Sequence, residues 1–239
     1  MKSIKILLVA LLAATTTSCM GDWSFGQVNG NGDVVVDERN VGSFDGVKGS
    51  AGLDVYLTEG DEEKVVVEAD ENLQEIITTE VVGGVLKVSA EKSIGRAKAK
   101  KVHVTYRKLT SVAASSGADV IGNSLIEAES ISLDSSSGAD LEVEVVAREV
   151  FLECSSGADI KVSGRTDNLV ASASSGSDIK ARELESRTCS ANASSGADIT
   201  VNVRERLNGK ASSGGDIKYY GDPEAVSAKD GYSGSVRKM

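Results

Sequence analysis

Six aspartates recur at nearly constant spacing in the second half of this 239-residue chain, each two residues after the glycine of a Ser-Ser-Gly corner: Asp119, Asp140, Asp159, Asp178, Asp198 and Asp216. If successive repeats stack, these carboxylates form a row with neighbours about 4.8 Å apart, and each pair repels by about 0.9 kcal/mol in water. A bridging Ca²⁺ ion would offset that repulsion, since Ca²⁺ prefers oxygen ligands. The alternative is local: each carboxylate accepts backbone N–H groups of its own corner, while serine hydroxyls donate along the row.

The repeat that carries these aspartates reads Ser-Ser-Gly-Ala-Asp followed by an aliphatic residue, with Ser177 and Gly215 in place of alanine. Its glycines lie 18–21 residues apart, at Gly117, Gly138, Gly157, Gly176, Gly196 and Gly214. A fixed period near twenty residues indicates a stacked repeat architecture, and aliphatic and polar residues alternate on both sides of each corner, as in strands with one buried face. We therefore expect an all-β fold, a right-handed parallel β-helix over residues 109–239, with positive φ at each glycine. A disordered Ser/Gly-rich linker would not show this alternation.

Residues 44–108 form a β-rich N-terminal section that lacks the repeat. Gly83-Gly84 predicts a tight hairpin turn, and residues 52–55 resemble an early, degenerate copy of the corner. Residues 71–76 are compatible with one helical turn. Strands are expected at residues 65–68, 78–82, 85–89 and 101–106.

The N-terminus has the features of an export signal. Lys2 and Lys5 precede a nine-residue apolar run that is too short to span a bilayer, so we interpret residues 1–18 as a signal peptide. Cys19 then stands where a bacterial lipoprotein carries its lipid, although Thr16 replaces the usual leucine. Ordinary cleavage near Ser18, which would release a soluble secreted chain, is the alternative. Residues 19–43 are rich in Gly, Asn and Asp and are expected to act as a tether.

Charge and cysteine usage limit the partners and the chemistry. The net charge is −10, which argues against nucleic acid as a partner. Cys154 and Cys189 occupy inward-facing positions two repeats apart and in different columns, so we expect two buried free thiols and neither a disulfide nor a metal site.

No residue pattern in the chain identifies a catalytic centre. The aspartates have six near-identical settings, whereas catalysis needs one special setting. His103 alternates with Val102 and Val104 and is expected to face outward. Lys161, Lys180 and Lys218 share one outward position, which suits a solvated wall or a weak contact with glycan or protein. Tyr219, Tyr220 and Tyr232 are expected to cap the open end of the coil.

The chain resembles the bacterial family called putative auto-transporter adhesin, head-GIN domain. The resemblance covers roughly residues 41–239 and is carried by Val41-Gly42-Ser43-Phe44, Leu53-Asp54-Val55, Gly83 to Leu86, the serial corners and Tyr219 to Pro223. It implies a β-helical exported protein of Gram-negative bacteria, often a lipoprotein, and it supplies no catalytic residues. The resemblance leaves the ligand and the side of the membrane open.

Sequence and resemblance together predict a non-catalytic, lipid-anchored scaffold in the cell envelope, at the outer membrane. It would bind a glycan or an envelope protein, need no cofactor unless Ca²⁺ binds, and could form a homo-oligomer through its coil ends. The alternatives are a carbohydrate-active enzyme of the β-helix type and a purely structural envelope protein.

Overall fold

A computed structural model describes residues 26–239, which consist of β-strands, connecting loops and one short 3₁₀ turn. The expected signal peptide at 1–18 and the expected lipid-carrying Cys19 lie outside the described residues. No helix among the described residues is both long and apolar enough to cross a bilayer.

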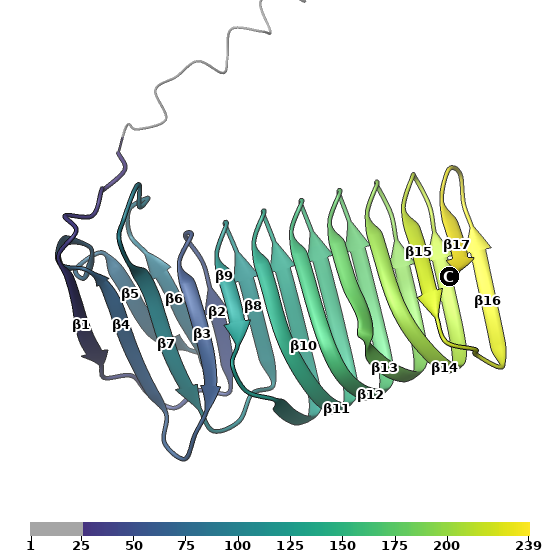
Figure 1. Ribbon diagram of the computed structural model, residues 1–239, viewed down its shortest axis with the longest axis horizontal. Coiled ribbons are helices and arrows are strands. Elements are labelled where there is room, and N and C mark those ends of the chain that lie inside the picture. The colour runs from purple at the N-terminus through teal and green to yellow at the C-terminus, as the bar shows by residue number, and fades with distance from the viewer. Residues whose placement is uncertain (1–25) are drawn as a thin grey trace, which may run out of the picture.

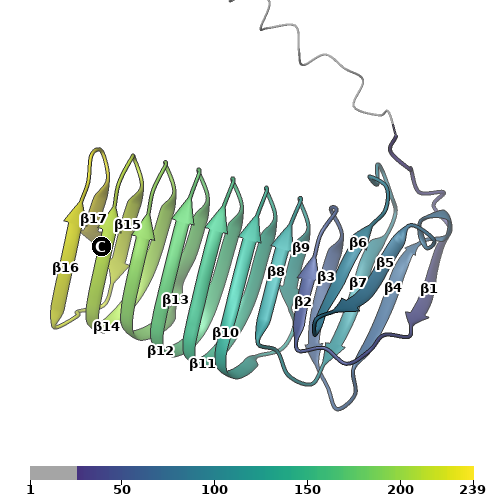
Figure 2. The same ribbon diagram turned by 180° about the vertical axis from the view of Figure 1, so that it is seen from behind.

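The chain forms a parallel β-solenoid of about seven turns (Figure 1). Each turn contributes two strands joined by a tight corner on one side and by a wider bend on the other. Strands that enter the corners form the pre-corner wall, and strands that leave them form the post-corner wall. In Figure 1 the near strands run down and the far strands run up as the chain advances from left to right, and Figure 2 shows the far wall from behind. The coil is therefore right-handed, and the expected parallel β-helix is confirmed.

The solenoid repeats pair in register. Asp140 aligns with Asp159 and Leu141 with Ile160, and the shifts in register fall toward the bend, where repeat lengths differ. Four long strands pass through a bend and so belong to both walls: β11 (Asp140–Ser155), β12 (Asp159–Ser174), β13 (Asp178–Ala193) and β14 (Asp198–Ala211). The remaining strands of the repeat region are β8 (Ser111–Ser115), β9 (Asp119–Gly122), β10 (Ile126–Ser136), β15 (Asp216–Tyr220), β16 (Ala225–Asp230) and β17 (Ser235–Lys238).

Each tight corner is a turn in which two consecutive residues have positive φ. At the first repeat corner Ser116 has φ 53° and Gly117 has φ 70°, and the Ala118 N–H donates to the Ser115 carbonyl over 3.2 Å. This is the type I′ geometry that joins strands of normal twist. The glycine conformation is as expected, whereas the positive φ of the preceding serine is a finding of the structure. The Gly117 N–H donates to the Ser137 carbonyl of the next coil, so hydrogen bonds also link the corners.

The core consists of aliphatic columns between the two walls. One column contains Val55, Val120, Leu141, Ile160, Ile179, Ile199 and Ile217, all at most 1 % exposed. Because each residue packs directly on its equivalent one coil away, burial continues along the whole length of the solenoid.

The N-terminal section begins with a coil of the same kind. β2 (Gly46–Gly49) and β3 (Asp54–Glu59) flank a corner in which Ala51 and Gly52 both have positive φ, which confirms the early copy. β2 and β3 pair with β8 and β9 on one side and with β6 (Val85–Ala90) and β7 (Lys100–Tyr106) on the other. The coil formed by β6 and β7 therefore comes later in the sequence but lies nearer the N-terminal end.

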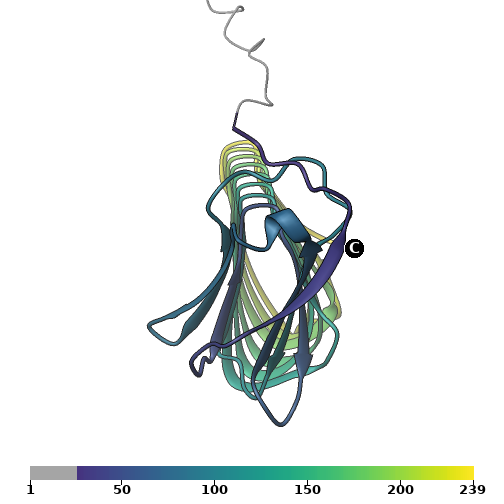
Figure 3. The same cartoon turned by 90° about the vertical axis from the view of Figure 1, so that its left-hand side faces the viewer.

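Antiparallel strands cover this end of the solenoid. β4 (Lys64–Asp70) pairs with β7, and β5 (Ile77–Val82) pairs with β6 through the expected Gly83-Gly84 turn. A single 3₁₀ turn, Glu71–Leu73, brings the fully buried Leu73 onto the core. Figure 3 looks along the coil from this end and shows the short helix in front of the opening.

The ordered fold starts earlier than residue 44. β1 (Val34–Arg39) pairs antiparallel with β4, and Val28 forms a bridge with Ile94. Both segments fall within the 19–43 range expected as a tether. The run Val34-Val35-Val36 has a high strand propensity and adds an edge strand here.

Candidate functional site

The stacking brings all six repeat aspartates into one row beside the corners. Each aligns with the next aspartate in the parallel register, and the row extends to Asp54 at its N-terminal end and to Ser235 at its C-terminal end. The row expected from the sequence is therefore present.

Lysines of the following coils partly neutralise this row. Lys180 Nζ lies 3.0 Å from Asp159 Oδ1, and Lys218 Nζ lies 3.2 Å from Asp198 Oδ1. Each lysine reaches back diagonally by one coil, which is possible only because the coils stack in register. Among residues 26–239 none of the six carboxylates accepts a backbone N–H. The expectation that each corner satisfies its own aspartate is thus wrong, since the partners come from neighbouring coils.

Asp119 and Asp140 are adjacent members of the row, and neither has an ion-pair partner within 4 Å among the described residues. Burial raises the pKa of Asp119, and the neighbouring carboxylates of Asp140 and Asp54 add to this effect. A shallow cavity of about 410 Å³ lies over these two aspartates, with Asp159, Lys161 and Lys180 at its border. No group of three or more His, Cys, Asp or Glu side chains in the described part of the chain is arranged to hold a metal ion.

Calcium binding to the row remains a prediction that melting experiments can test. If Ca²⁺ bridges Asp119 and Asp140, millimolar CaCl₂ should raise the melting temperature of the full chain, and a chelator should reverse the rise, because a ligand that binds only the folded state stabilises it. Asp140→Asn should abolish the effect, whereas Asp61→Asn, an exposed loop change, should retain it. An identical melting temperature with chelator and with CaCl₂ would refute the hypothesis.

The two described cysteines are buried free thiols, as expected. Cys154 donates to the Ala158 carbonyl over 3.1 Å, and Cys189 packs in register between Leu169 and Leu207. Burial raises the pKa of Cys154 to about 11 and that of Cys189 to about 12. At neutral pH both groups are therefore protonated and poorly nucleophilic.

His103 faces outward on β7, also as expected. Its ring stacks on Tyr56 with 5.4 Å between the ring centroids, and its Nε2 lies 3.1 Å from Glu68 Oε2. The hydrogen bond with His103 is the main cause that holds the pKa of Glu68 below its usual value. The cluster stands outside the repeat, on the surface of the N-terminal section.

One outward column of the pre-corner wall differs in chemistry from the post-corner wall. The post-corner wall carries charged side chains paired between coils, for example Lys161 with Glu142 at 2.6 Å. The central outward column of the pre-corner wall is uncharged and contains Ser111, Ser132, Phe151, Val170, Ser190, Asn208 and Ser227.

Two apolar side chains interrupt this polar column. Phe151 and Val170 are each 40 % exposed and lie side by side in the register of β11 and β12. The sequence analysis missed them. The available signal was an apolar residue at an outward position that serine or asparagine occupies in the other repeats.

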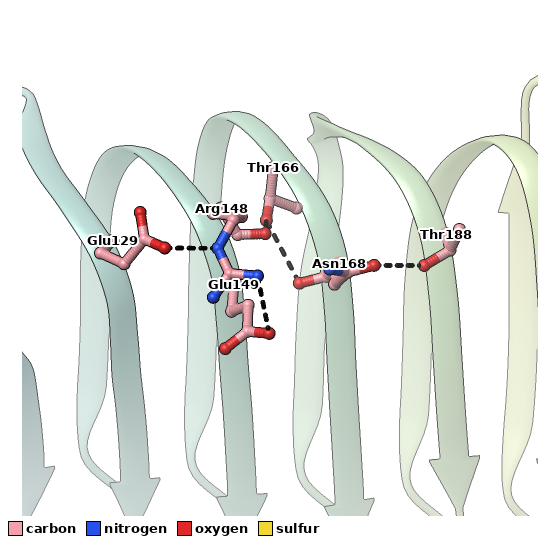
Figure 4. A network of polar contacts seen from close by, with 6 residues as sticks. All are labelled: Glu129, Arg148, Glu149, Thr166, Asn168 and Thr188. Carbon is pink, nitrogen blue, oxygen red and sulfur yellow. Dashed lines mark hydrogen bonds and ion pairs between the residues drawn. The ribbon is translucent and has the colours of Figure 1, made fainter.

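Alternating charges join the coils at the bend. Glu129, Arg148, Asp167, Arg187 and Glu205 follow one another from coil to coil, and Arg187 Nε lies 3.0 Å from Glu205 Oε2. Figure 4 shows that Arg148 contacts both Glu129 and Glu149, and that Thr188 donates to the Asn168 side chain over 2.9 Å. Opposite charges at equivalent positions favour the observed stacking order, although each exposed pair contributes at most about 1 kcal/mol.

Fold and surface together define a β-solenoid protein whose post-corner wall carries charge pairs between coils and whose pre-corner wall carries one uncharged outward column with the exposed Phe151 and Val170. Residues 43–223 match the family model "Putative auto-transporter adhesin, head GIN domain", so the chain belongs to this family, as its corner repeats suggested.

Solved structures share the fold at low sequence identity. A putative adhesin from Bacteroides fragilis NCTC 9343 aligns with a TM-score of 0.83 and 17 % identity over 89 % of this chain and 100 % of that one. A putative lipid binding protein from Parabacteroides distasonis ATCC 8503 aligns with a TM-score of 0.73 and 21 % identity, over 89 % and 99 % of the two chains. A putative adhesin from Parabacteroides merdae ATCC 43184 aligns with a TM-score of 0.67 and 21 % identity over 90 % of this chain and 99 % of that one. No curated protein matches the chain.

Proposed function

We propose that this chain is a non-catalytic, lipid-anchored binding scaffold of the bacterial cell envelope, and that its pre-corner wall binds a glycan or a protein. Membership of an adhesin family supports a binding role. Two of the similar solved structures are named putative adhesins and one a putative lipid binding protein.

The exposed Phe151–Val170 pair carries this proposal. An aromatic ring beside hydroxyl, amide and carboxylate groups offers an apolar face for a sugar ring or a side chain and hydrogen bonds around it. Ser132, Ser172, Ser190 and Asn192 lie at neighbouring positions of β10, β12 and β13, and the exposed Glu153 lies two residues from Phe151 on the same face of β11. The surface is flat and repeats with the coil spacing of about 4.8 Å, which suits an extended ligand.

Binding is tested with the full chain on immobilised neutral and acidic polysaccharides, and in parallel by pull-down of envelope proteins from intact cells. Phe151→Ser should weaken the binding observed at least tenfold, which corresponds to about 1.4 kcal/mol. Val146→Ser is the matched control, because Val146 is similarly exposed but lies at the bend. Equal binding by both variants would contradict the proposed surface, and turnover of a polysaccharide would favour the enzyme alternative.

The anchor is tested separately through Cys19. Cys19→Ala should move the chain from the membrane fraction to the soluble fraction, because loss of the acyl chains removes the proposed attachment. Ser18→Ala serves as the control and should leave the chain in the membrane fraction. Membrane association that survives Cys19→Ala would refute lipidation at this residue, and protease access in intact cells would then report on exposure at the cell surface.

A further inference from the structure

The two ends of the solenoid differ in what covers the core. At the N-terminal end, antiparallel strands extend both walls as far as β1 and β5, and the 3₁₀ turn places the fully buried Leu73 over the core. At the other end, β16 pairs only with β14, and β17 pairs only with β15. Within residues 26–239 nothing pairs with the outer edges of these two strands, so both walls end in a row of free backbone hydrogen-bonding groups.

The core is also open at this end. Val226 continues the inward column of Leu207, yet Val226 is 44 % exposed while Leu207 is fully buried. All six residues of β16 are exposed, and a groove of about 410 Å³ runs beside the strand. The expected tyrosine cap is wrong in part, because Tyr232 is 92 % exposed at the final corner and covers neither column.

We propose that this open end binds the same end of a second copy of the chain, so that two solenoids associate tail to tail. A single added strand would satisfy only one of the two edges. The end of a second copy presents two strands with the same separation, so it pairs with both edges at once and covers the exposed core columns. A two-fold axis closes such an interface, because the same surface is used on both copies.

Strand direction and charge favour one arrangement. β16 and β17 run in opposite directions around the final coil, so a two-fold axis parallel to the strands places β16 antiparallel to the partner's β17. This places the segment 224–230, whose Glu224, Lys229 and Asp230 sum to a charge of −1, beside the basic β17 strand with Arg237 and Lys238. Pairing β17 with its own copy would instead bring the basic side chains of Arg237 and Lys238 together, which is unfavourable.

Light scattering coupled to size exclusion tests the proposal on the full chain in detergent. We expect a dimer, twice the 24.8 kDa of one chain after allowance for detergent and any removed signal peptide. Val226→Lys should raise the dissociation constant at least tenfold, because a charge would be buried in the interface. Val146→Lys is the matched control, since Val146 is 43 % exposed but lies at a bend, and it should leave the dimer intact.

Any of the following results would overturn the proposed tail-to-tail dimer. A monomer across the accessible concentration range, a dimer that withstands Val226→Lys, or equal loss with Val146→Lys would exclude this interface. An open series of larger species would indicate head-to-tail assembly instead. Thermal melting of Val226→Lys at a concentration where the wild type is monomeric checks that the variant folds, and Ala228→Lys in the same strand provides a second probe if it does not.

Discussion

Gly164→Ala is expected to lower the free energy of unfolding by about 3–5 kcal/mol, the combined cost of an unfavourable backbone conformation and a steric clash. Gly164 has φ 112°, and a Cβ atom there would overlap the backbone carbonyl of Val145 in the neighbouring coil. The carbonyl is part of the β11–β12 ladder, so the coil cannot move away without loss of register. Urea titration followed by circular dichroism measures the effect.

Gly157→Ala is the matched control for this prediction. Gly157 has φ 69° at a corner, and a Cβ atom there would meet no other atom within 4 Å. Only the conformational cost of about 1–2 kcal/mol should remain. Equal losses for Gly164→Ala and Gly157→Ala would show that close approach of the two coils does not constrain Gly164.

Asp70→Asn is expected to destabilise the covered N-terminal end by about 2–4 kcal/mol, because it removes a buried charged acceptor. The Asp70 carboxylate is fully buried and accepts backbone N–H groups from Gly32 over 2.9 Å, Ala99 over 2.9 Å and Lys98 over 3.1 Å. It therefore fixes the segment before β1 to the loop between β6 and β7. An asparagine amide would direct an N–H toward these donors and leave some of them without a partner.

Because of the Asp70 carboxylate, we also expect the protein to lose stability in acid. Burial acts to raise the pKa of Asp70, but the three backbone N–H groups outweigh it and hold the pKa below the usual value of 3.8. A group with a lower pKa in the folded state stabilises the fold fully above its unfolded pKa and loses this contribution as the pH falls through the folded value. The contribution of Asp70 should therefore be complete at neutral pH and decline below about pH 4.

Melting curves of the wild type, Asp70→Asn and Asp61→Asn between pH 2.5 and pH 7 separate this effect from general acid denaturation. Asp61 is exposed in a loop, and its substitution should leave the pH profile unchanged. The melting temperature of Asp70→Asn should differ most from that of the wild type at pH 7 and approach it in acid. A difference that stays constant over this range would contradict the assigned role of the charge.

The sequence predicts the repeats well because their pattern is local. Period-two alternation and the corner glycines are sufficient to predict the strands, the stacking and the buried position of Cys154 and Cys189. The positive φ of Ser116 and its equivalents was not predicted, because serine rarely adopts this conformation and only the two-residue turn imposes it.

Features that depend on distant pairing were not predictable in this way. Nothing local indicates that β6 and β7 lie outside β2 and β3, or that β1 adds to β4. The register places Asp178 beside Asp159 and Lys180 beside Lys161, so the contact of Lys180 with Asp159 is diagonal and depends on the conformation of the lysine side chain. The neighbours of Asp70 come from segments near residues 32 and 98, which only the three-dimensional fold brings together.

Both outer walls, the aspartate row and the open end depend on one claim: equivalent residues of successive coils lie directly over one another. Electron–electron distances between pairs of spin labels on one outward column of the pre-corner wall test this claim. One label replaces Lys48, and the second replaces Asn192, Lys210 or Lys229 in turn. Labelled chain is diluted in unlabelled chain, so that only distances within one chain are measured. The coil spacing predicts backbone distances of about 24, 29 and 34 Å for five, six and seven coils. Cys154 and Cys189 are buried and should not react with the label. Distances that fail to increase in this order would contradict the stacking and every surface derived from it.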